Sequence, residues 1–308
     1  MKNAIEIKNL QKTYAADGKS PEKVALHNID LDIPAGSIFG LLGPNGAGKS
    51  TIINIMAGLV VKSAGTMQIW DEDIDRDARN ARAAIGIVPQ EINFDPFFTP
   101  RQILDIQSGL YGVPKSERWI MELLHMVDLR DKADSHSRSL SGGMKRRLMV
   151  AKALVHKPPI LVLDEPTAGV DVELRQMLWA NVRKLNDQGM TILLTTHYLE
   201  EAEELCDQIA IINHGRIVAN EDKESLLQRI ESKEIRFRFQ NEITDIPTEF
   251  KNFNPVKEGR RTLALRYAPK DQSMDEIVRI VQTMDNPLTD ITTDESDLED
   301  IFLQLTKD

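Results

Sequence analysis

The glycine-rich segment GPNGAGKST, at residues 43–51, constrains this chain more than any other feature of its sequence. The apolar run before it, residues 38–42, predicts a short buried strand, and the segment after it predicts a helix that ends near Leu59. Glycines allow a positive φ and a close approach of the backbone, so successive N–H groups can point at phosphate oxygens beside the positive end of a helix dipole. This order of strand, glycine loop and helix favours a phosphate-binding loop over an ordinary glycine-rich turn.

Two side chains at the end of this loop have the chemistry that a nucleotide phosphate requires. Lys49 would reach the β- and γ-phosphates, and the hydroxyl of Ser50 would ligate Mg²⁺. The residues predicted to surround the phosphates are Gly43, Pro44, Asn45, Gly46, Ala47, Gly48, Lys49, Ser50 and Thr51.

Length and composition set the broad class of the protein. The 308 residues suffice for about two domains, and a hydrophobic content of 41% suffices for a real core. The formal net charge of −10 argues against a dominant surface for nucleic acid. A single cysteine, Cys206, argues against a disulfide framework and suits a reducing compartment. With no leader-like start and no apolar run of membrane-spanning length, the chain is expected to be soluble by itself.

The N-terminal segment alternates apolar and polar residues in two stretches, residues 5–10 and residues 25–33. Alternation with a period of two predicts two strands, and their succession favours an antiparallel pair. Tyr14 is expected in a loop between them, where its ring can stack on a purine base. A packing role for Tyr14 is equally compatible with the sequence.

Two polar residues follow closely after apolar segments that are expected to form buried strands. Gln90 comes after residues 84–88, and His197 comes after residues 191–196. Ligands of open α/β sheets gather outside the carboxyl ends of the strands. Gln90 can therefore reach a metal or an attacking water, and His197 can donate to a γ-phosphate. Taken alone, each residue also fits an ordinary strand end in solvent.

A further apolar run, at residues 160–163, ends in two carboxylates, Asp164 and Glu165. Asp164 suits coordination of the metal that Ser50 would hold. Glu165 suits a water in line with the γ-phosphate, which it would orient or deprotonate. The alternative, a pair of solvated acids at a strand end, loses weight once the phosphate loop is considered.

The pattern becomes helical between about residues 99 and 156. Thr99 followed by Pro100 predicts a capped helix start. Near the end of this insertion, Ser141-Gly142-Gly143 opens another predicted helix, where backbone N–H groups can bind an anion. Spacing alone would favour a simple capped helix start at this point.

Four glutamates then crowd one predicted helix: Glu200, Glu201, Glu203 and Glu204. Such a run is typical of a solvated acidic face, which is the structure expected here. The next segment, residues 210–218, has two apolar stretches around Asn213-His214-Gly215 and predicts a β-hairpin.

The character of the chain changes beyond residue 230. Alternation at residues 235–239 predicts a strand, and two more strands are expected around residues 263–265 and Ile291. Two capping-box pairs predict helices. The pairs are Ser273 with Glu276 and Ser296 with Glu299. Residues 231–308 are therefore expected to form a small α+β domain, in which no catalytic motif is recognisable.

Taken together, the motifs resemble those of the ATPase subunits of ABC transporters over about residues 3–220. The motifs that carry the resemblance, in the order of that family, are the phosphate loop at residues 43–51, Gln90, Leu140-Ser141-Gly142-Gly143, Leu161-Val162-Leu163-Asp164-Glu165, Asp171 and His197. The resemblance implies an α/β fold of the P-loop NTPase class. An ABC ATPase domain at residues 1–230 would combine an antiparallel β subdomain with a helical subdomain at about residues 99–156. The small α+β C-terminal domain at residues 231–308 would follow.

The resemblance also implies roles that spacing alone does not give. Tyr14 matches the aromatic residue that stacks on adenine, Gln90 the glutamine that senses the metal, and His197 the switch histidine. Ser141 and Gly143 match the signature that contacts the γ-phosphate bound to an opposite subunit. The implied catalytic residues are Glu165, His197, Gln90 and Lys49, the implied metal ligands are Ser50, Gln90 and Asp164, and the implied signature contacts to the nucleotide are Ser141, Gly142 and Gly143. The implied cofactors are ATP and Mg²⁺, held in a head-to-tail homodimer that closes on ATP and opens after hydrolysis.

The finer wording of the motifs, such as Ala168-Gly169-Val170-Asp171, is similar to that of the ABC-2-type export group. That group pairs a separate ATPase chain with an integral membrane permease and moves drugs, lipids or polysaccharides outward. The resemblance thus implies a protein bound to a permease at the cytoplasmic face of the membrane, with no nucleic-acid partner. The ATPase of an importer, and an ABC ATPase of DNA repair or translation, stay open as alternatives. Met144 departs from the common glutamine at the last position of the signature, and a thioether accepts hydrogen bonds poorly.

Overall fold

A computed structural model describes residues 2–16, 21–168, 170–227, 233–267, 272–284, 286–294 and 298–306. The chain divides into two compact units, Met1–Lys223 and Glu224–Asp308. The domain boundary expected at residue 230 lies outside the described residues. The first unit contains every motif that the sequence analysis assigned to a nucleotide.

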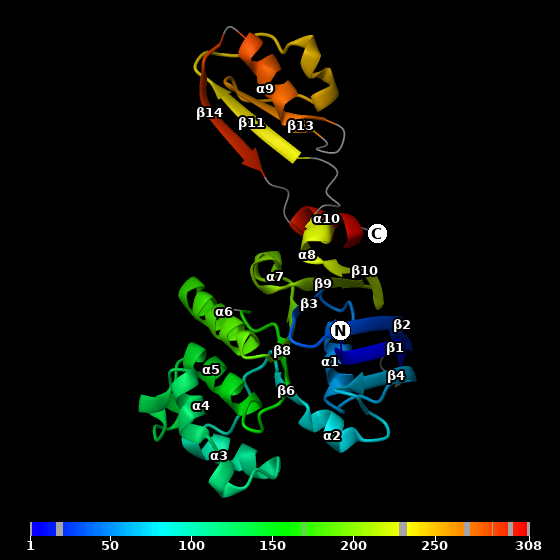
Figure 1. Ribbon diagram of the computed structural model, residues 1–308, viewed down its shortest axis with the longest axis vertical. Coiled ribbons are helices and arrows are strands. Elements are labelled where there is room, and N and C mark those ends of the chain that lie inside the picture. Colours follow the sequence, from blue (N-terminus) through cyan, green and yellow to red (C-terminus); the bar gives the residue numbers. More distant parts are fainter. Residues whose placement is uncertain are drawn as a thin grey trace. The chain divides into compact units, whose positions relative to one another are not determined.

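A six-stranded sheet forms the centre of the first unit (Figure 1). In sheet order its strands are β10 (Arg216–Asp222), β9 (Gln208–Asn213), β3 (Ile38–Leu42), β8 (Thr191–Thr196), β7 (Ile160–Asp164) and β6 (Ile85–Val88). From β9 to β6 neighbouring strands are parallel, whereas β10 returns antiparallel to β9 and confirms the predicted hairpin. All residues of β3 and β8 are buried, which explains why these strands read as unbroken apolar runs.

A second, antiparallel sheet has the order β2 (Lys23–Pro34), β1 (Asn3–Tyr14), β4 (Ala64–Ile69) and β5 (Glu72–Asp73). The predicted antiparallel pair of N-terminal strands is therefore confirmed. The loop predicted for Tyr14 is wrong, because Tyr14 is the last residue of β1 and pairs with Lys23 of β2. Pairing continues past Leu10 through register shifts that break the simple alternation of the sequence.

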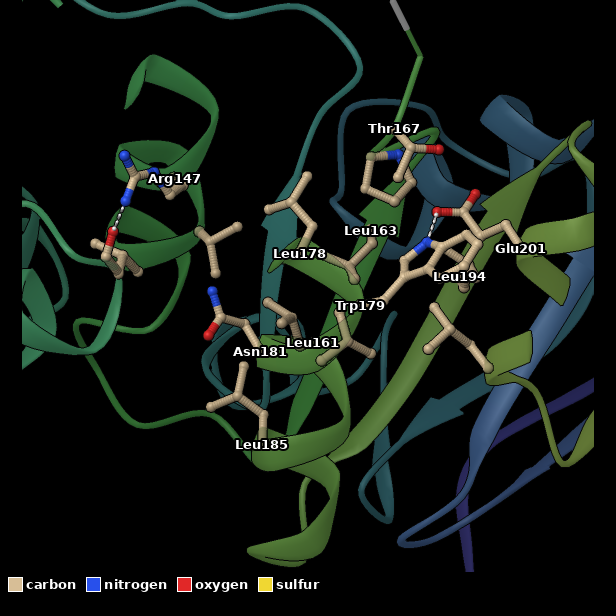
Figure 2. Close-up of a pocket in the computed structure, with 15 residues that line it drawn as sticks. Arg147, Leu161, Leu163, Thr167, Leu178, Trp179, Asn181, Leu185, Leu194 and Glu201 are labelled. Carbon is tan, nitrogen blue, oxygen red and sulfur yellow. Dashed lines mark hydrogen bonds between the residues drawn. The ribbon is translucent and has the colours of Figure 1, made fainter. Parts of the chain in front are cut away.

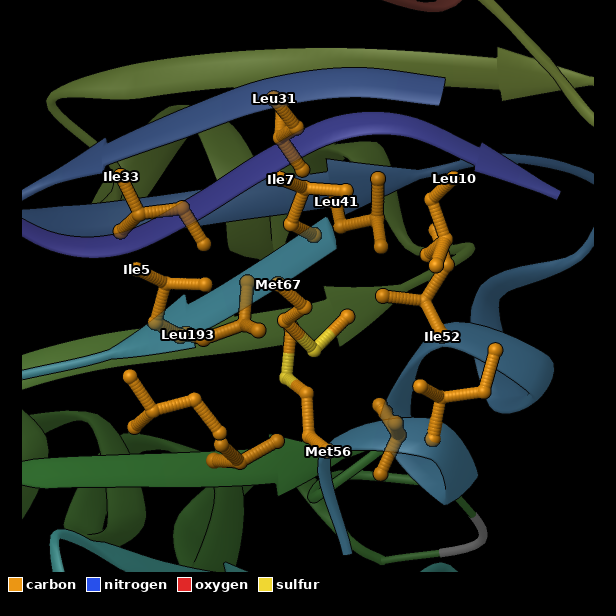
Figure 3. Close-up of a cluster of buried hydrophobic side chains, with 14 of the residues drawn as sticks. Ile5, Ile7, Leu10, Leu31, Ile33, Leu41, Ile52, Met56, Met67 and Leu193 are labelled. Atoms are coloured by element: carbon orange, nitrogen blue, oxygen red, sulfur yellow. The ribbon is translucent and has the colours of Figure 1, made fainter. Parts of the chain in front are cut away.

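The main core lies between the two sheets and the helix α1 (Lys49–Met56). Figure 3 shows Ile7 and Met67 of the antiparallel sheet close to Leu41 and Leu193 of the central sheet, with Met56 of α1 beside them. Each of these side chains is at most 1% exposed. Burial of a side chain of this size contributes about 1.5–3 kcal/mol to folding. The core therefore fixes α1 relative to β3.

The helices of the first unit are α1, α2 (Ala78–Ala83), α3 (Pro100–Leu110), α4 (Ile120–Met126), α5 (Gly142–Ala153), α6 (Val172–Asp187) and α7 (Leu199–Leu205), with short 3₁₀ turns at Lys115–Glu117, Arg130–Lys132 and Ser137–Ser139. Helix α1 ends three residues before its predicted end, and Gly58 follows with a φ of 72°. Helix α3 begins as predicted, with Thr99 and Gln102 forming a reciprocal capping box. Among the described residues, no helix has the length and apolar composition needed to cross a membrane.

Gly86 of β6 lies so close to the backbone of α5 that no side chain fits there. A Cβ on Gly86 would lie 2.2 Å from the carbonyl oxygen of Ala153. We expect Gly86→Ala to lose about 1–3 kcal/mol of unfolding free energy, the usual cost of overpacking, as measured by urea unfolding. The control is Gly142→Ala, where a Cβ would meet no atom within 4 Å. An equal loss in both variants would contradict this explanation.

The second unit is built on an antiparallel sheet with the strand order β12 (Val256–Glu258), β13 (Thr262–Tyr267), β11 (Lys233–Phe239) and β14 (Leu288–Asp294). The strands predicted around residues 235–239, 263–265 and Ile291 are present, and β12 is an additional one. β14 lies at an edge, paired only with β11 in the part of the chain that the structure describes. The described side chains of β14 are all exposed.

The helices of this unit are α8 (Lys223–Leu227), α9 (Met274–Thr283) and α10 (Leu298–Thr306), with a 3₁₀ turn at Thr248–Phe253. Ser273 caps α9 by accepting a hydrogen bond from the N–H of Asp275, at 3.2 Å. Ser296, the predicted cap of the last helix, lies outside the described residues. A core of its own, which includes Phe237, Phe250 and Ile277, makes this unit an independent compact body.

Candidate functional site

The loop between β3 and α1 has the backbone geometry of a phosphate cradle. Gly46 and Gly48 adopt φ angles of 82° and 120°, which residues with a side chain rarely adopt. Space is also restricted: a Cβ on Gly43 would lie 2.3 Å from the carbonyl oxygen of Ile212, and one on Gly48 would lie 2.8 Å from a methyl carbon of Leu26. These glycines are therefore required by the path of the loop and by its packing.

Lys49, the first residue of α1, turns its side chain back into this loop. Its Nζ donates to the carbonyl oxygen of Gly43 and, at 3.4 Å, to that of Pro44. The side chain is only 5% exposed. Burial lowers the pKa of Lys49, and the carboxylates of Glu165 and Asp164 oppose this change. The loop thus holds a buried cation among its own carbonyls, where it can meet a bound anion.

The carboxylate of Glu165 brings the separate motifs together. Gln90 Nε2 donates to its Oε2 at 2.9 Å, His197 Nδ1 lies 3.3 Å from its Oε1, and Lys49 Nζ lies 3.9 Å from the same Oε1. The side chain of Glu165 is only 8% exposed. The alternative interpretation of the sequence, a solvated acid at a strand end, is therefore wrong for Glu165. Three residues predicted from the sequence, Lys49, Gln90 and His197, therefore meet at the buried carboxylate of a fourth, Glu165.

Asp164, the last residue of β7, lies beside this group. Its Oδ1 accepts a hydrogen bond of 2.6 Å from the hydroxyl of Thr195 on the neighbouring strand β8. Burial raises the pKa of Asp164, whereas the bond from Thr195 lowers it. A cation placed next to this half-buried carboxylate would stabilise its charged form, which burial disfavours.

One hollow of about 190 Å³ lies on the surface of the first unit beside this group. Of the predicted site residues of the first unit, Gly43, Ala47, Asp164 and His197 do not line it. Its walls are Tyr14, Lys23, Ala25, Pro44, Asn45, Gly46, Gly48, Lys49, Ser50, Thr51, Gln90 and Glu165. The end of β1 therefore places Tyr14 at the same hollow as the phosphate loop, although its secondary structure was predicted wrongly. Ser141, Gly142 and Gly143 do not line it; Ser141 caps α5, accepting from the N–H of Met144 at 3.3 Å.

Sequence reasoning missed Arg146 of α5, which is 3% exposed and donates to four backbone carbonyls around the hollow. The spacing gave no signal that singles it out, because α5 is buried on most of its sides and Arg147 also lies among buried residues. Once this burial is known, a buried arginine indicates a partner for its charge.

The acidic helix α7 differs from its prediction, because Glu201 is fully buried while Glu200 and Glu204 are exposed. Figure 2 shows Glu201 accepting a hydrogen bond from Trp179 of α6, whose Nε1 lies 3.2 Å from its Oε1. Glu201 shares the inner face of α7 with Ala202 and Leu205, so the charge run is not a uniformly solvated face. Burial raises the pKa of Glu201, and hydrogen bonds such as that from Trp179 oppose the rise.

The Glu201→Gln variant is expected to be more stable than the wild type at neutral pH, by about 1.4 kcal/mol for a pKa difference of one unit. A glutamine oxygen can still accept from Trp179, and it carries no charge to bury. Since the folded pKa of Glu201 is raised, the cost of burial is absent below the unfolded pKa of about 4.3, grows as the pH rises from there to the folded pKa, and is complete above the folded pKa.

Melting temperatures at pH 4 and pH 7.5 measure this difference. The gain should be present at pH 7.5 and vanish at pH 4, and Glu200→Gln, on the exposed side of α7, should show no such trend. A loss of stability in Glu201→Gln at both pH values would contradict the argument.

Comparison with known proteins shows the family to which the chain belongs. A family model described as ABC transporter matches residues 26–168. The Nod factor export ATP-binding protein I of Burkholderia orbicola is 41% identical over 226 residues, which are 73% of this chain and 72% of that protein. The chain belongs to the ABC transporter ATP-binding proteins. The Nod factor export ATP-binding protein I of Ralstonia nicotianae matches this ABC protein over 98% of the chain and 93% of its own length, at 35% identity.

The fold agrees with this assignment. An ATP-binding cassette solved as a dimer, in a post-hydrolysis state bound to ADP and Pi, has a TM-score of 0.62 and 28% identity to this ABC protein. The similarity covers 71% of this chain and 98% of the other. The predicted P-loop α/β fold with an antiparallel sheet is thereby confirmed, and the protein is an ABC ATPase, the ATP-binding subunit of an ABC transporter.

Proposed function

We propose that this ABC ATPase energises export of a substrate through a separate membrane permease, by ATP-driven dimerisation at the cytoplasmic face of the membrane. The observation that carries the proposal is the meeting of Lys49, Gln90 and His197 at the carboxylate of Glu165. These groups have the charges and donors that phosphoryl transfer to water needs.

The hollow supplies both halves of a nucleotide site. The loop N–H groups and Lys49 would hold the phosphates, and the half-exposed ring of Tyr14 would stack on the adenine. Lys12 lies over the Tyr14 ring, with its Nζ 4.8 Å from the ring centre, and limits one face of it. The other face is the one that we assign to the base.

The donor set beside the loop fits Mg²⁺. Ser50, Gln90 and Asp164 offer a hydroxyl, an amide and a carboxylate oxygen, which are hard ligands. Among the described residues no group of three or more His, Cys, Asp or Glu side chains could hold a metal by itself. This suits Mg²⁺, which binds through one or two protein oxygens together with substrate phosphates. When bound, the ion would neutralise charge on the phosphates.

Glu165 would orient and deprotonate the attacking water, as general base. Gln90 and His197 hold its two oxygens in place, so the carboxylate need not reorganise during the reaction. Lys49 and His197 both lie near Oε1 of Glu165. His197 is the more exposed of these two side chains and would contact the γ-phosphate. The whole arrangement requires a second chain to exclude water from the open side of the hollow.

That second chain would supply Ser141, Gly142 and Gly143. They lie at the exposed start of α5, outside the hollow of their own chain, where α5 can present its N–H groups to a nucleotide held by a partner. The solved cassette that is dimeric with ADP and Pi supports a dimer of ATPase chains, for which we propose the head-to-tail arrangement.

Exposed apolar side chains between Gln90 and the end of α3 would contact the permease. They are Ile92, Phe97, Phe98, Ile106 and Leu110. Their nearness in sequence to Gln90 would link the partner to the nucleotide. The named relatives, which are export ATP-binding proteins, support the outward direction. Residues 231–308 would form an accessory domain.

The test is a pull-down of tagged Glu165→Gln protein, with ATP and Mg²⁺, from gently solubilised membranes, followed by mass spectrometry. A multi-span protein at a stoichiometric ratio is expected, and it should be depleted with Lys49→Ala as the matched control. Recovery with ribosomes or nucleic acid instead would support a non-transport ABC ATPase. ATP-driven substrate movement through the reconstituted permease, away from the ATPase side, distinguishes export from import.

A further inference from the structure

Arg146 lies in the second turn of α5 and spans two loops that the chain brings together at the nucleotide hollow. Its Nη1 donates to the carbonyl oxygens of Pro89, at 2.8 Å, and Gln90, at 2.7 Å. Its Nη2 donates to the carbonyl oxygen of Glu165 at 2.6 Å, and its Nε to that of Pro166 at 2.9 Å. One guanidinium thus holds the backbones of Gln90 and Glu165, whose side chains also bond to each other.

The Glu165 backbone needs such support. Glu165 has a φ of 46°, in the left-handed region that residues other than glycine rarely adopt. Its N–H is held by Thr195, through the carbonyl oxygen at 3.0 Å and the hydroxyl at 3.2 Å. Its carbonyl is held by Arg146. The strained residue is therefore clamped on both sides, and one of the clamps is a charged side chain from a different helix.

Burial of the guanidinium shows that this arrangement is costly to build. Arg146 is 3% exposed, and its burial lowers the pKa of the guanidinium. The nearby carboxylates of Asp164, Glu201 and Glu165 oppose this lowering. A buried cation is retained only where hydrogen bonds and opposite charges compensate for lost water. The planar fork of arginine donates to four carbonyls, whereas a lysine ammonium is a compact charge with only three donors.

We propose that Arg146 is a positioning residue for ATP hydrolysis, which fixes Gln90 and Glu165 relative to each other and keeps Glu165 in its strained backbone conformation. The proposal rests on the assignment of Glu165 as the general base. Arg146 does not line the hollow, so it acts through these residues and not on the nucleotide. Its loss should reduce the rate of the chemical step and leave ATP affinity nearly unchanged.

The neighbouring Arg147 provides a matched control. It is 7% exposed on the same helix, and its Nη1 donates to the carbonyl oxygens of Val127 and Asp128 and to the Asp128 carboxylate. It is thus an equally buried arginine that binds backbone carbonyls away from the hollow.

The test compares Arg146→Lys and Arg146→Gln with Arg147→Lys in the full-length protein. Phosphate release gives kcat and KM, and calorimetry gives ATP affinity. For both Arg146 variants we expect kcat to fall about 100-fold, the effect of a misplacement near 1 Å, with affinity changed less than about threefold. Arg147→Lys should keep kcat within about threefold, whatever its melting temperature.

A second measurement isolates the role of Arg146. In a Glu165→Gln background the additional change Arg146→Lys should have almost no further effect on turnover, because the base that it positions is already lost. Near-normal kcat in both Arg146 variants, or an equal loss in Arg147→Lys, would overturn the proposal. So would failure of both Arg146 variants to fold while Arg147→Lys folds, since the role would then be structural. Retained turnover in Glu165→Gln alone would instead overturn the proposed function.

Discussion

Replacing Glu165 by glutamine is expected to reduce steady-state ATP hydrolysis by about 1,000-fold while ATP still binds, because a well-placed general base contributes about 10²–10⁴ in rate. Glutamine keeps the size of the side chain and one acceptor for its neighbours Gln90 and His197. It removes the negative charge that would take a proton from water. Binding through the loop and Lys49 does not depend on that charge.

A dimer that cannot hydrolyse its nucleotide should accumulate. Phosphate release measures turnover, and size-exclusion chromatography with ATP and Mg²⁺ measures the dimer. Glu122→Gln, at an exposed position of α4, is the control and should keep both properties of the wild type. Turnover within about tenfold of the wild type in Glu165→Gln would remove Glu165 from the role of base.

The Lys49→Ala variant is expected to bind ATP about 10–100-fold more weakly, because hydrogen bonds to charged groups contribute about 1.5–3 kcal/mol each. Lys49 is already buried and held by carbonyls of the loop, so little further ordering opposes its contact with phosphate. The same change removes the cation 3.9 Å from Glu165. Dimer formation at moderate ATP concentrations should therefore fail as well.

Calorimetric titration with ATP measures the affinity. Lys132→Ala is the matched control, since Lys132 is exposed in a 3₁₀ turn far along the chain from the loop. Melting temperatures without nucleotide show whether the variant is folded. An unchanged affinity in folded Lys49→Ala would contradict the assignment of the phosphate site.

The phosphate loop could be predicted because its geometry is encoded locally. Gly46 and Gly48 are required by backbone angles, and Lys49 follows at a fixed spacing. The same holds for Asp164 and Glu165, which end an apolar strand. The polar residues that follow the parallel strands could be expected to lie close together, because the carboxyl ends of parallel strands meet at one edge of the sheet.

Three features could not be read from the same signals, because they depend on packing between distant segments. Tyr14 stays in a strand since β1 and β2 continue to pair through register shifts. Glu201 is buried because α7 turns one side towards Trp179, whereas its charge run suggests solvent. Arg146 is conspicuous only once its helical face is known to be buried.

The free edge of β14 has a consequence for the solution behaviour of the second unit. An unpaired strand edge offers its backbone N–H and C=O groups to any other extended chain, and natural proteins guard such edges with charge. Along β14 the exposed apolar side chains of Leu288 and Ile291 would favour contact with the side chains of an added strand. The carboxylate of Asp290, which lies between them in the sequence, opposes this addition. In the part of the chain that the structure describes, β14 can therefore pair with another extended chain, and the charge of Asp290 opposes that pairing.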